Sequence, residues 1–297
     1  MPEIKRVIAL GFFDGVHLGH AALMEMTRRR ALERGVSPAV LTFDTHPDTL
    51  VKGVEVPLIN SPEGRAEIIR RVYGIESVIF IHFNRAVMQM PWEDFLRSLV
   101  DELHAEHVVV GYDFSCGYRG EGRAVKIAGW CSSHGLGCDI IDAVKLDGAV
   151  VSSTRIRALI AEGDMEEANR LLGHPHCLVD TVHYGFQLGC RLGTPTINMR
   201  FAEGVLVPRH GVYAAKVFLD NGEERMAVTN IGVRPTVSGS DRVSVESYIL
   251  DFDGDLYDHT VRVEFHRFLR DEKKFAGVEE LRAQILRDAQ TTREYFA

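Results

Sequence analysis

The segment from residue 7 to residue 35 constrains the fold more than any other part of the chain. The apolar run Val7-Ile8-Ala9-Leu10 predicts a buried strand, and residues 21–34 predict a helix that ends before Gly35. Between them lies the turn Gly11-Phe12-Phe13-Asp14-Gly15-Val16-His17-Leu18-Gly19-His20. Such a turn gathers backbone N–H groups and the positive end of a helix dipole at one point. The segment therefore predicts an anion site that two histidines can both face.

The residues that follow continue the alternation of strands and helices. Apolar runs predict strands at 39–43, 78–81, 108–114 and 139–141, and helical patterns separate them at 62–73, 91–103 and 121–134. This order implies a parallel sheet with right-handed crossovers. Ligands of such sheets bind beyond the carboxyl ends of the strands, where His20, Asn84 and Asp113 fall.

The pattern changes after Cys177. Short β-rich runs at 212–219, 225–231, 244–252 and 261–268 are separated by turns such as Asp220-Asn221-Gly222, and a helix is expected over 278–295. The spacing favours a small antiparallel barrel. The chain is therefore expected to hold an α/β domain over residues 1–176 and a β domain with a terminal helix over residues 177–297.

Composition limits where the chain works and what it binds. The net charge of -8 weighs against general binding of nucleic acid but leaves nucleotides open. No apolar run approaches the ~18–20 residues that span a bilayer, and the first residues lack the pattern of a signal peptide. Five cysteines without a Cys-x-x-Cys pair argue for the reducing cytoplasm and against a zinc site.

The glycine-rich turn carries a family resemblance. His-x-Gly-His after a first strand is similar to the signature of the nucleotidylyl-transferase superfamily, whose fold is Rossmann-like. The longer stretch from Phe13 to His20 resembles the FAD synthetase module of bacterial bifunctional riboflavin kinase/FAD synthetases. The resemblance implies that His17 and His20 are catalytic, stabilising charge on the leaving group. The ATP-binding residues that it implies in this module are Gly11, Phe12, Phe13, Asp14, His17, Gly19, His20 and Asp113.

A second motif, Val151-Ser152-Ser153-Thr154-Arg155-Ile156-Arg157, follows in the same domain. Hydroxyl groups at a helix N-terminus can cap it and can also bind phosphate, and arginines can act as forked donors. In related nucleotidylyl transferases this segment grips the triphosphate, which implies ATP binding by Ser153, Thr154 and Arg155. The alternative is a capping box with a solvated basic face.

The second half carries its own resemblance. Gly193-Thr194-Pro195-Thr196-Ile197-Asn198 looks like the Gly-x-Pro-Thr-x-Asn of riboflavin kinases, and segments 229–236, 245–252 and 269–275 also match that module in order. Thr196 and Asn198 alternate by two, so both oxygens point to one face and suit Mg²⁺ shared with phosphates. The resemblance implies flavin or ATP binding by Gly189, Gly193, Pro195, Thr196, Asn198, Asn230 and Arg270. Glu246 is the candidate general base toward the ribityl 5′-hydroxyl; the alternative is an exposed strand glutamate.

Several positions depart from the family pattern. Thr45 replaces a proline, Ser115-Cys116-Gly117 replaces Arg-Phe-Gly, and His174 stands where arginine is frequent. Asp180 stands at an expected glycine, Cys190 at an expected arginine and Asp258 at a further glycine. The unusual residues before Gly193 keep a degenerate kinase module open as an alternative.

The whole chain resembles a cytoplasmic enzyme with two activities. One module would phosphorylate riboflavin to FMN with ATP, and the other would transfer AMP from ATP to FMN, giving FAD and pyrophosphate, both with Mg²⁺. The alternatives are an FAD synthetase without kinase activity and a non-catalytic flavin-binding regulator. The expected partners are small-molecule substrates, without nucleic acid or membrane, and a weak homo-oligomer is left open.

Overall fold

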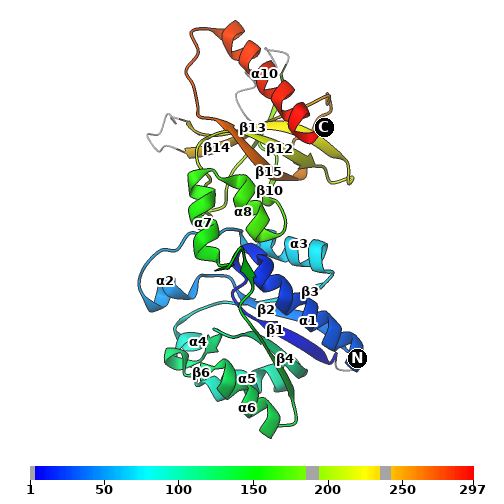
Figure 1. The fold of residues 1–297 in the computed structure, drawn as a ribbon, viewed down its shortest axis with the longest axis vertical. Helices are drawn as coiled ribbons and strands as arrows, with labels where there is room; N and C mark the ends of the chain where they lie inside the picture. Colours follow the sequence, from blue (N-terminus) through cyan, green and yellow to red (C-terminus); the bar gives the residue numbers. More distant parts are fainter. Residues whose placement is uncertain (1–3, 185–193, 235–241) are drawn as a thin grey trace. The chain divides into compact units, whose positions relative to one another are not determined.

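A five-stranded parallel sheet organises the first half of the chain (Figure 1). The computed structural model describes residues 4–184, 194–234 and 242–297, and it divides into two compact units, residues 1–153 and 154–297. The strand order in the first unit is β3-β2-β1-β4-β7. The bounds are Arg6–Leu10 for β1, Ser37–Phe43 for β2, Ser77–Ile81 for β3, Ala105–Gly111 for β4 and Gly137–Ile141 for β7.

The strand order reverses direction between β1 and β4, which are neighbours in the sheet. The crevice at such a reversal, outside the carboxyl ends of the strands, is where open α/β sheets bind ligands. Residues 11–20 leave the end of β1, and Asp113 follows the end of β4. The fold thus places both predicted segments at the switch point.

Helices cover both faces of this sheet (Figure 1). Side chains of β1 and β4 that share one face, among them Ile8 and Val108, pack with α5 and α6, while the other face of β1 meets α1. The helices are α1 (Leu18–Arg34), α2 (Pro47–Val51), α3 (Pro62–Tyr73), α4 (Arg85–Gln89), α5 (Trp92–Asp101) and α6 (Ala124–Ser133). The short elements are η1 (Asp14–Val16), η2 (Tyr118–Gly120), β5 (Ser115–Cys116), β6 (Gly122–Arg123), β8 (Lys145–Leu146) and β9 (Ala149–Val150).

Two element boundaries differ from the sequence prediction. Helix α1 begins at Leu18 rather than Ala21, because His17 is its N-cap and accepts the N–H of Gly19. Helix α6 begins at Ala124 rather than residue 121, because η2 and the β5–β6 pair occupy the preceding residues. The predicted end of α1 is confirmed: Gly35 lies in the left-handed region with φ 67°.

The second unit is built on a six-stranded antiparallel sheet with the order β10-β15-β12-β13-β14-β11. An isolated bridge between His183 and Asn198 connects the segment after β10 to β11, so the sheet curls into a half-barrel. Its strands are β10 (His176–Thr181), β11 (Thr196–Met199), β12 (Gly211–Phe218), β13 (Glu224–Arg234), β14 (Arg242–Ile249) and β15 (Thr260–Arg270). The helices are α7 (Ser153–Glu162), α8 (Met165–Leu172) and α10 (Val278–Phe296).

The two faces of this half-barrel have different partners. Val217, Val263 and Phe265 are buried in the interior. On the other face, Val212 and Val228 pack against Ala289 of α10. The predicted turn at Asp220-Asn221-Gly222 joins β12 to β13, and Gly222 takes φ 85° there. The predicted fold class, a parallel α/β sheet followed by a small antiparallel sheet and a terminal helix, is confirmed.

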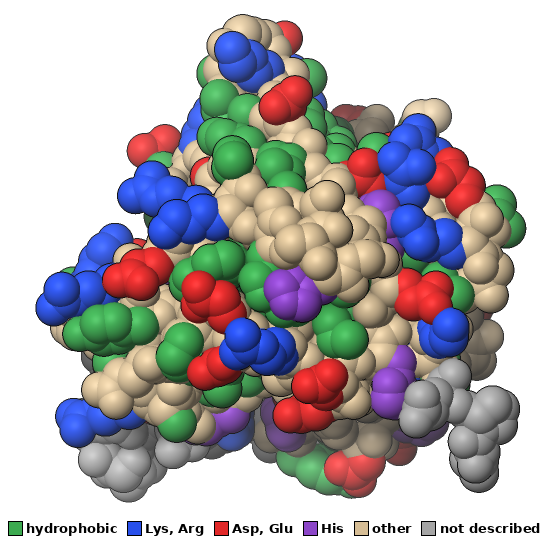
Figure 2. Space-filling model, turned by 90° about the horizontal axis from the view of Figure 1, so that it is seen from below, with side chains coloured by type: hydrophobic (Ala, Val, Ile, Leu, Met, Phe, Trp, Pro, Cys, Tyr) green, Lys and Arg blue, Asp and Glu red, His purple; other side chains and the backbone are tan. Residues whose placement is uncertain are grey.

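None of the helices in the described residues is long and apolar enough to cross a membrane. On the face shown in Figure 2, basic and acidic side chains are interspersed.

Candidate active sites

The histidine loop, residues 11–20, is shaped by an unusual backbone path. Phe13, Gly15 and Val16 all take positive φ values, of 55°, 80° and 46°. For Phe13 and Val16 this conformation is strained, and it persists only where the surroundings hold it in place. The result is a tight turn that delivers His17 to the N-cap of α1 and His20 to the first turn of that helix.

His17 and His20 stack face to face. Their ring centroids lie 3.6 Å apart with an interplanar angle of 15°. The Nδ1 of His17 accepts the N–H of Gly19 at 3.1 Å, so a neutral His17 ring carries its proton on Nε2. The loop therefore orients a ring N–H donor at the positive end of a helix, which suits phosphate oxygens.

His20 is held in its neutral form. Its Nδ1 is buried without a hydrogen-bond partner among the described residues, and Phe13 meets the ring edge-on at 5.2 Å. Burial lowers the pKa of His20 well below its usual value, and the nearby charges of His17 and Arg65 lower it further. A neutral imidazole keeps one ring N–H, which can donate a hydrogen bond to an anion.

Glycine at position 19 is required by the histidine ring beside it. A Cβ there would lie 2.9 Å from the His17 ring, closer than real Cβ contacts allow. A Cβ at Gly11 would lie 2.7 Å from the ring of Phe13. Both glycines thus let aromatic rings close over the backbone of the loop.

Asp14 and Ser153 support the loop from within the first unit. Asp14 is 1% exposed, and its Oδ1 accepts the backbone N–H of Ile59 at 2.9 Å and that of Asn60 at 3.4 Å. Its carbonyl oxygen accepts the hydroxyl of Ser153 at 2.9 Å. Both residues were expected to bind ATP, and in the structure their hydrogen bonds fix the loop.

Arg65 of α3 is a component that sequence reasoning missed. It is fully buried, and its Nη1 donates to the carbonyl oxygens of Phe12 and Phe43, each at 2.8 Å. The same nitrogen donates to Thr42 Oγ1 at 2.9 Å, and the guanidinium lies 4.4 Å from the centre of the Phe12 ring. An arginine in a helix that also carries Arg70 and Arg71 gives no signal in the sequence that it alone turns inward.

Other predicted residues of this module lie as follows. Asp113 is exposed two residues beyond β4, and Asn84 caps α4 by accepting the N–H groups of Ala86 and Val87. Thr154 and Arg155 belong to the second unit. There Arg155 Nη2 donates to Glu167 Oε1 at 3.0 Å.

In the second unit, the sheet register aligns three predicted residues across adjacent strands. Asn198 of β11 lies directly opposite Glu246 of β14, and Glu246 lies directly opposite Asn230 of β13. Directly opposed residues share a face with Cβ atoms about 4.5–5.5 Å apart. Asn198, Glu246 and Asn230, named the polar row here, therefore form one line, while the flanking Val245 and Ser247 are buried on the other face.

Polar atoms of this region remain without partners among the described residues. The Oδ1 of Asn198 and the Oγ1 of Thr194 are both buried and make no hydrogen bond there. Buried oxygens of native proteins normally have partners, so a water, a bound group or a residue outside the described ranges would complete these two. Asn230 Nδ2 donates to Glu272 Oε1 at 3.3 Å, which orients the amide at the end of the row.

Arg270 extends the same line but is already paired. It lies opposite Val212, which lies opposite Asn230. Its guanidinium donates to both carboxylate oxygens of Asp288, at 2.7 to 3.1 Å, and Asp288 also accepts from Gln284 at 2.8 Å. Asp288 is 5% exposed, so the pair anchors α10 to β15.

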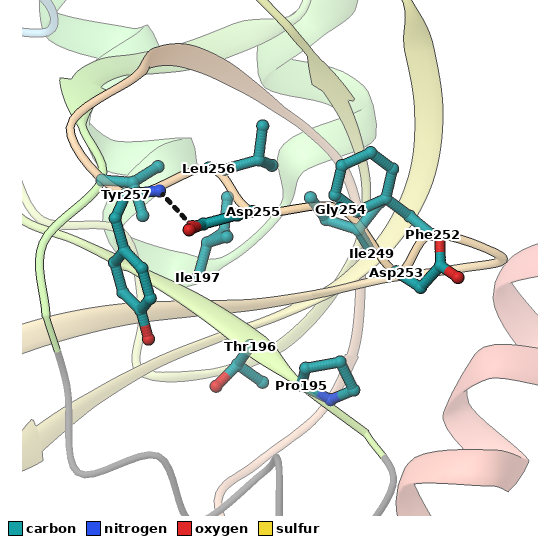
Figure 3. A pocket seen from close by; sticks show the side chains of 11 residues that line it. Pro195, Thr196, Ile197, Ile249, Phe252, Asp253, Gly254, Asp255, Leu256 and Tyr257 are labelled. Atoms are coloured by element: carbon teal, nitrogen blue, oxygen red, sulfur yellow. Dashed lines mark hydrogen bonds between the residues drawn. The ribbon is translucent and has the colours of Figure 1, made fainter.

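A pocket opens beside Thr196 (Figure 3). Its volume is about 260 Å³, and Tyr257, Leu256 and Asp255 form one side of it. The Tyr257 N–H donates to Asp255 Oδ1 at 3.0 Å, and the Tyr257 ring stacks on Tyr184 with centroids 4.0 Å apart. The lining residues are Val182, Pro195, Thr196, Ile197, Ile249, Phe252, Asp253, Gly254, Asp255, Leu256 and Tyr257.

The unusual Asp180 has a structural role. Its Oδ2 accepts the backbone N–H of Arg200 at 2.8 Å and lies 3.2 Å from His183 Nε2. A glycine could not make this tie between the end of β10 and the residue after β11. The predicted residues Gly189 and Gly193, and the departure at Cys190, lie outside the described residues.

Comparison with known families decides what these two sites belong to. A family model described as FAD synthetase matches residues 2–155, and one described as riboflavin kinase matches residues 172–296. The chain belongs to the family of bifunctional riboflavin kinase/FMN adenylyltransferases. Both activities therefore reside in this one chain. The prediction of a bifunctional enzyme is confirmed in preference to an FAD synthetase without kinase activity or a non-catalytic flavin-binding regulator.

Curated relatives match over nearly the full length. The bifunctional riboflavin kinase/FMN adenylyltransferase of Listeria monocytogenes is 38% identical, with 99% of this chain and 94% of the relative covered. Those of Bacillus subtilis and Escherichia coli K12 are 33% and 32% identical, with the same 99% and 94% covered.

A solved structure shares the fold along the whole chain. It is described as a macrolide-efflux protein from Streptococcus pneumoniae, is 27% identical and superposes with a TM-score of 0.85. The comparison covers 99% of this chain and 95% of that one. The efflux description belongs to that protein, and the likeness is used here for the fold.

Proposed function

We propose that the polar row carries the chemistry of riboflavin phosphorylation. Glu246 accepts the proton of the ribityl 5′-hydroxyl while that oxygen bonds to the γ-phosphorus of ATP and the bond to the β–γ bridging oxygen breaks. The supporting observation is the register, which places this carboxylate between two amides, Asn198 and Asn230, on one face. The products are FMN and ADP.

Asn198 and Thr196 fit a site for Mg²⁺. Thr196 and Asn198 offer neutral oxygens from one strand, on the face that also carries Glu246. The orphaned Oδ1 of Asn198 supports this, because Mg²⁺ takes few protein oxygens and shares its other positions with water and phosphate. When bound, the ion neutralises phosphate charge.

The pocket beside Thr196 is proposed to take the adenine ring of ATP. Its walls are mostly apolar, from Val182, Pro195 and Leu256, and Tyr257 adds an aromatic face. With the adenine ring in this pocket, the phosphates of ATP would extend toward Thr196. This residue is shared between the pocket and the proposed metal site.

The histidine loop is proposed to carry FMN adenylylation. A phosphate oxygen of FMN bonds to the α-phosphorus of ATP, the bond to the α–β bridging oxygen breaks, and pyrophosphate leaves. His17 and His20 donate hydrogen bonds toward the leaving group, where negative charge grows. ATP binding at this site also stays a prediction for Gly11, Phe12, Phe13, Asp14, Gly19, Asp113, Ser153, Thr154 and Arg155.

The assignment of the two reactions to two separate sites is tested by substituting a histidine of the loop and measuring the rates of both reactions. His20→Ala should slow FAD formation from FMN by roughly a hundredfold or more, since lost donors to a developing anion cost about 10²–10³ in rate. FMN formation from riboflavin should stay at the wild-type rate. His134→Ala, an exposed histidine of the same unit, is the control. Unchanged FAD formation by His20→Ala would remove the histidine loop from the reaction.

Two finer expectations complete the proposal. The boundary between the modules near residue 176 and a weak homo-oligomer stay predictions. Limited proteolysis and analytical ultracentrifugation of the purified chain, respectively, test them.

A further inference from the structure

We propose that Arg65 is a positioning residue for FMN adenylylation. Its buried guanidinium ties the histidine loop to the end of the neighbouring strand and holds a fixed positive charge inside that loop. The inference rests on the proposed role of His17 and His20, and it adds a residue from α3, a helix outside both sequence motifs.

The contacts of Arg65 cross-link two strand ends. Phe12 lies two residues beyond β1, and Phe43 is the last residue of β2, which pairs with β1. One nitrogen of Arg65 holds both carbonyl oxygens at 2.8 Å. Thr42 reinforces the tie, because its hydroxyl donates to the same Phe12 oxygen at 2.7 Å. The strained residue Phe13 follows directly, so this link sets where the turn begins.

A packing role alone does not account for an arginine here. Its side chain is 0% exposed, and its Nε and Nη2 are buried without hydrogen-bond partners in the described parts of the chain. Burying a cation is costly unless opposite charge lies near it, and an apolar side chain of similar volume would avoid that cost. Burial lowers the pKa of Arg65 to about 10, so it remains cationic at neutral pH.

The charge of Arg65 acts on the histidine pair. The positive groups that bear on His20 are His17 and Arg65, and both favour its neutral form. The acidic groups that bear on Arg65 are Asp14, Asp44 and Glu63, from the loop, the end of β2 and α3. The guanidinium thus fixes the turn by hydrogen bonds, and its charge adds to burial and His17 in favouring the neutral form of His20.

Two substitutions separate these effects, Arg65→Met and Arg65→Lys. Arg65→Met should lower kcat for FAD formation from FMN by about tenfold to a hundredfold, because a small displacement of a catalytic loop has that cost. Its acid limb in the pH–rate profile should move to higher pH, because loss of the positive charge raises the pKa of His20. Arg65→Lys keeps the charge, so the acid limb should stay at the wild-type pH and part of kcat should return.

Controls come from the same chain. FMN formation from riboflavin should stay at the wild-type rate in both variants, which shows that the second unit is folded. An unchanged thermal unfolding profile shows the same for the first unit, which holds Arg65. Arg70→Met changes an exposed arginine of the same helix and should leave both reactions unchanged. If Arg65→Met loses both activities through misfolding, Arg65→Lys carries the test alone, with reduced FAD formation, intact FMN formation and an unmoved acid limb.

Three results would overturn the inference: wild-type FAD formation by Arg65→Met, an acid limb that does not move in that variant, or equal loss of both activities in Arg65→Lys. His20→Ala measured in parallel distinguishes the causes. If His20→Ala is impaired and Arg65→Met is not, only the role of Arg65 fails. If both keep FAD formation, the assignment of the histidine loop itself fails.

Discussion

The histidine loop of the first unit and the polar row of the second are both proposed to bind phosphate groups. The loop is built from neighbouring residues, whereas the row is built from residues far apart in the chain. The loop is ten consecutive residues whose backbone turn, left-handed φ values and three glycines set the ring positions. The row takes one residue from each of three strands and depends wholly on their register. A one-residue slip of β14 would move Glu246 to the opposite face. The first site is therefore vulnerable to local backbone changes and the second to changes in pairing.

The largest effect should come from the proposed metal ligand of the row. Asn198→Ala removes the orphaned Oδ1, so FMN formation should fall by roughly a hundredfold or more, since a bound metal supplies several kcal/mol of transition-state stabilisation. FAD formation from supplied FMN should persist. Steady-state assays across a range of Mg²⁺ concentrations check this. Arg200→Ala, at an exposed residue just beyond β11, is the control; equal loss in both variants would point to damage of the strand.

A single added methyl group at Gly19 is expected to disrupt the histidine loop. Gly19→Ala should slow FAD formation by about tenfold or more, because the added Cβ would lie 2.9 Å from the His17 ring and must displace it. FMN formation should not change. Gly129→Ala in α6, where a Cβ meets nothing within 4 Å, should leave both rates intact. An active Gly19→Ala enzyme would show that the close approach of the His17 ring is dispensable.

The anchor of α10 should appear mainly in stability. Asp288→Asn leaves the Arg270 guanidinium without its charged partner, and the free energy of unfolding should fall by about 1–3 kcal/mol, a value discounted because Arg270 keeps 24% of its side chain exposed. Denaturant unfolding measures it. Asp251→Asn breaks the exposed pair with Arg293 on the same helix and should cost about 0–1 kcal/mol. Equal losses of unfolding free energy in the two variants would show that the buried pair contributes no more than the exposed one.

The effect that is smallest at neutral pH concerns His176, a buried histidine at the start of β10. His176 stacks on Phe265, has no partner for either ring nitrogen among the described residues, and burial lowers its pKa to about 3. The unfolded chain binds a proton near pH 6.5 and the folded chain does not, so stability should fall as pH drops from about 6.5 toward 3, by up to about 1.4 kcal/mol per pH unit.

His176→Phe should flatten that acid slope and leave stability at pH 8 nearly unchanged. Thermal unfolding at several pH values gives the comparison with the wild-type chain. A slope that persists in the variant would mean that other groups cause the acid destabilisation.

The sequence predicted the locally built histidine loop better than the polar row, which is built across three strands. The histidine loop, its strand and its helix lie in one segment, so their local signals were sufficient, and only the exact start of α1 at the His17 cap was missed. Thr196 and Asn198 were placed on one face from their spacing. The alignment of Asn198 with Glu246 and Asn230 was not predictable, because register across three strands has no local signal.

Arg65 and Arg270 show most clearly which side-chain contacts could not be predicted from the sequence. Arg65 sits among several charged residues of α3, and only the folded sheet reveals that it turns inward to two carbonyl oxygens. Arg270 stays a prediction for substrate binding, and its pairing with Asp288, eighteen residues away on another element, had no signal in the sequence. Side chains whose partners come from elsewhere in the chain are those that sequence reasoning locates least well.

The most direct test of the two-site account is the flavin output of Glu246→Gln, separated by chromatography. The purified variant is incubated with ATP and Mg²⁺ and either riboflavin or FMN. The account predicts no FMN or FAD from riboflavin and a wild-type rate of FAD formation from FMN. FMN production from riboflavin at the wild-type rate, or loss of both conversions together, would contradict it.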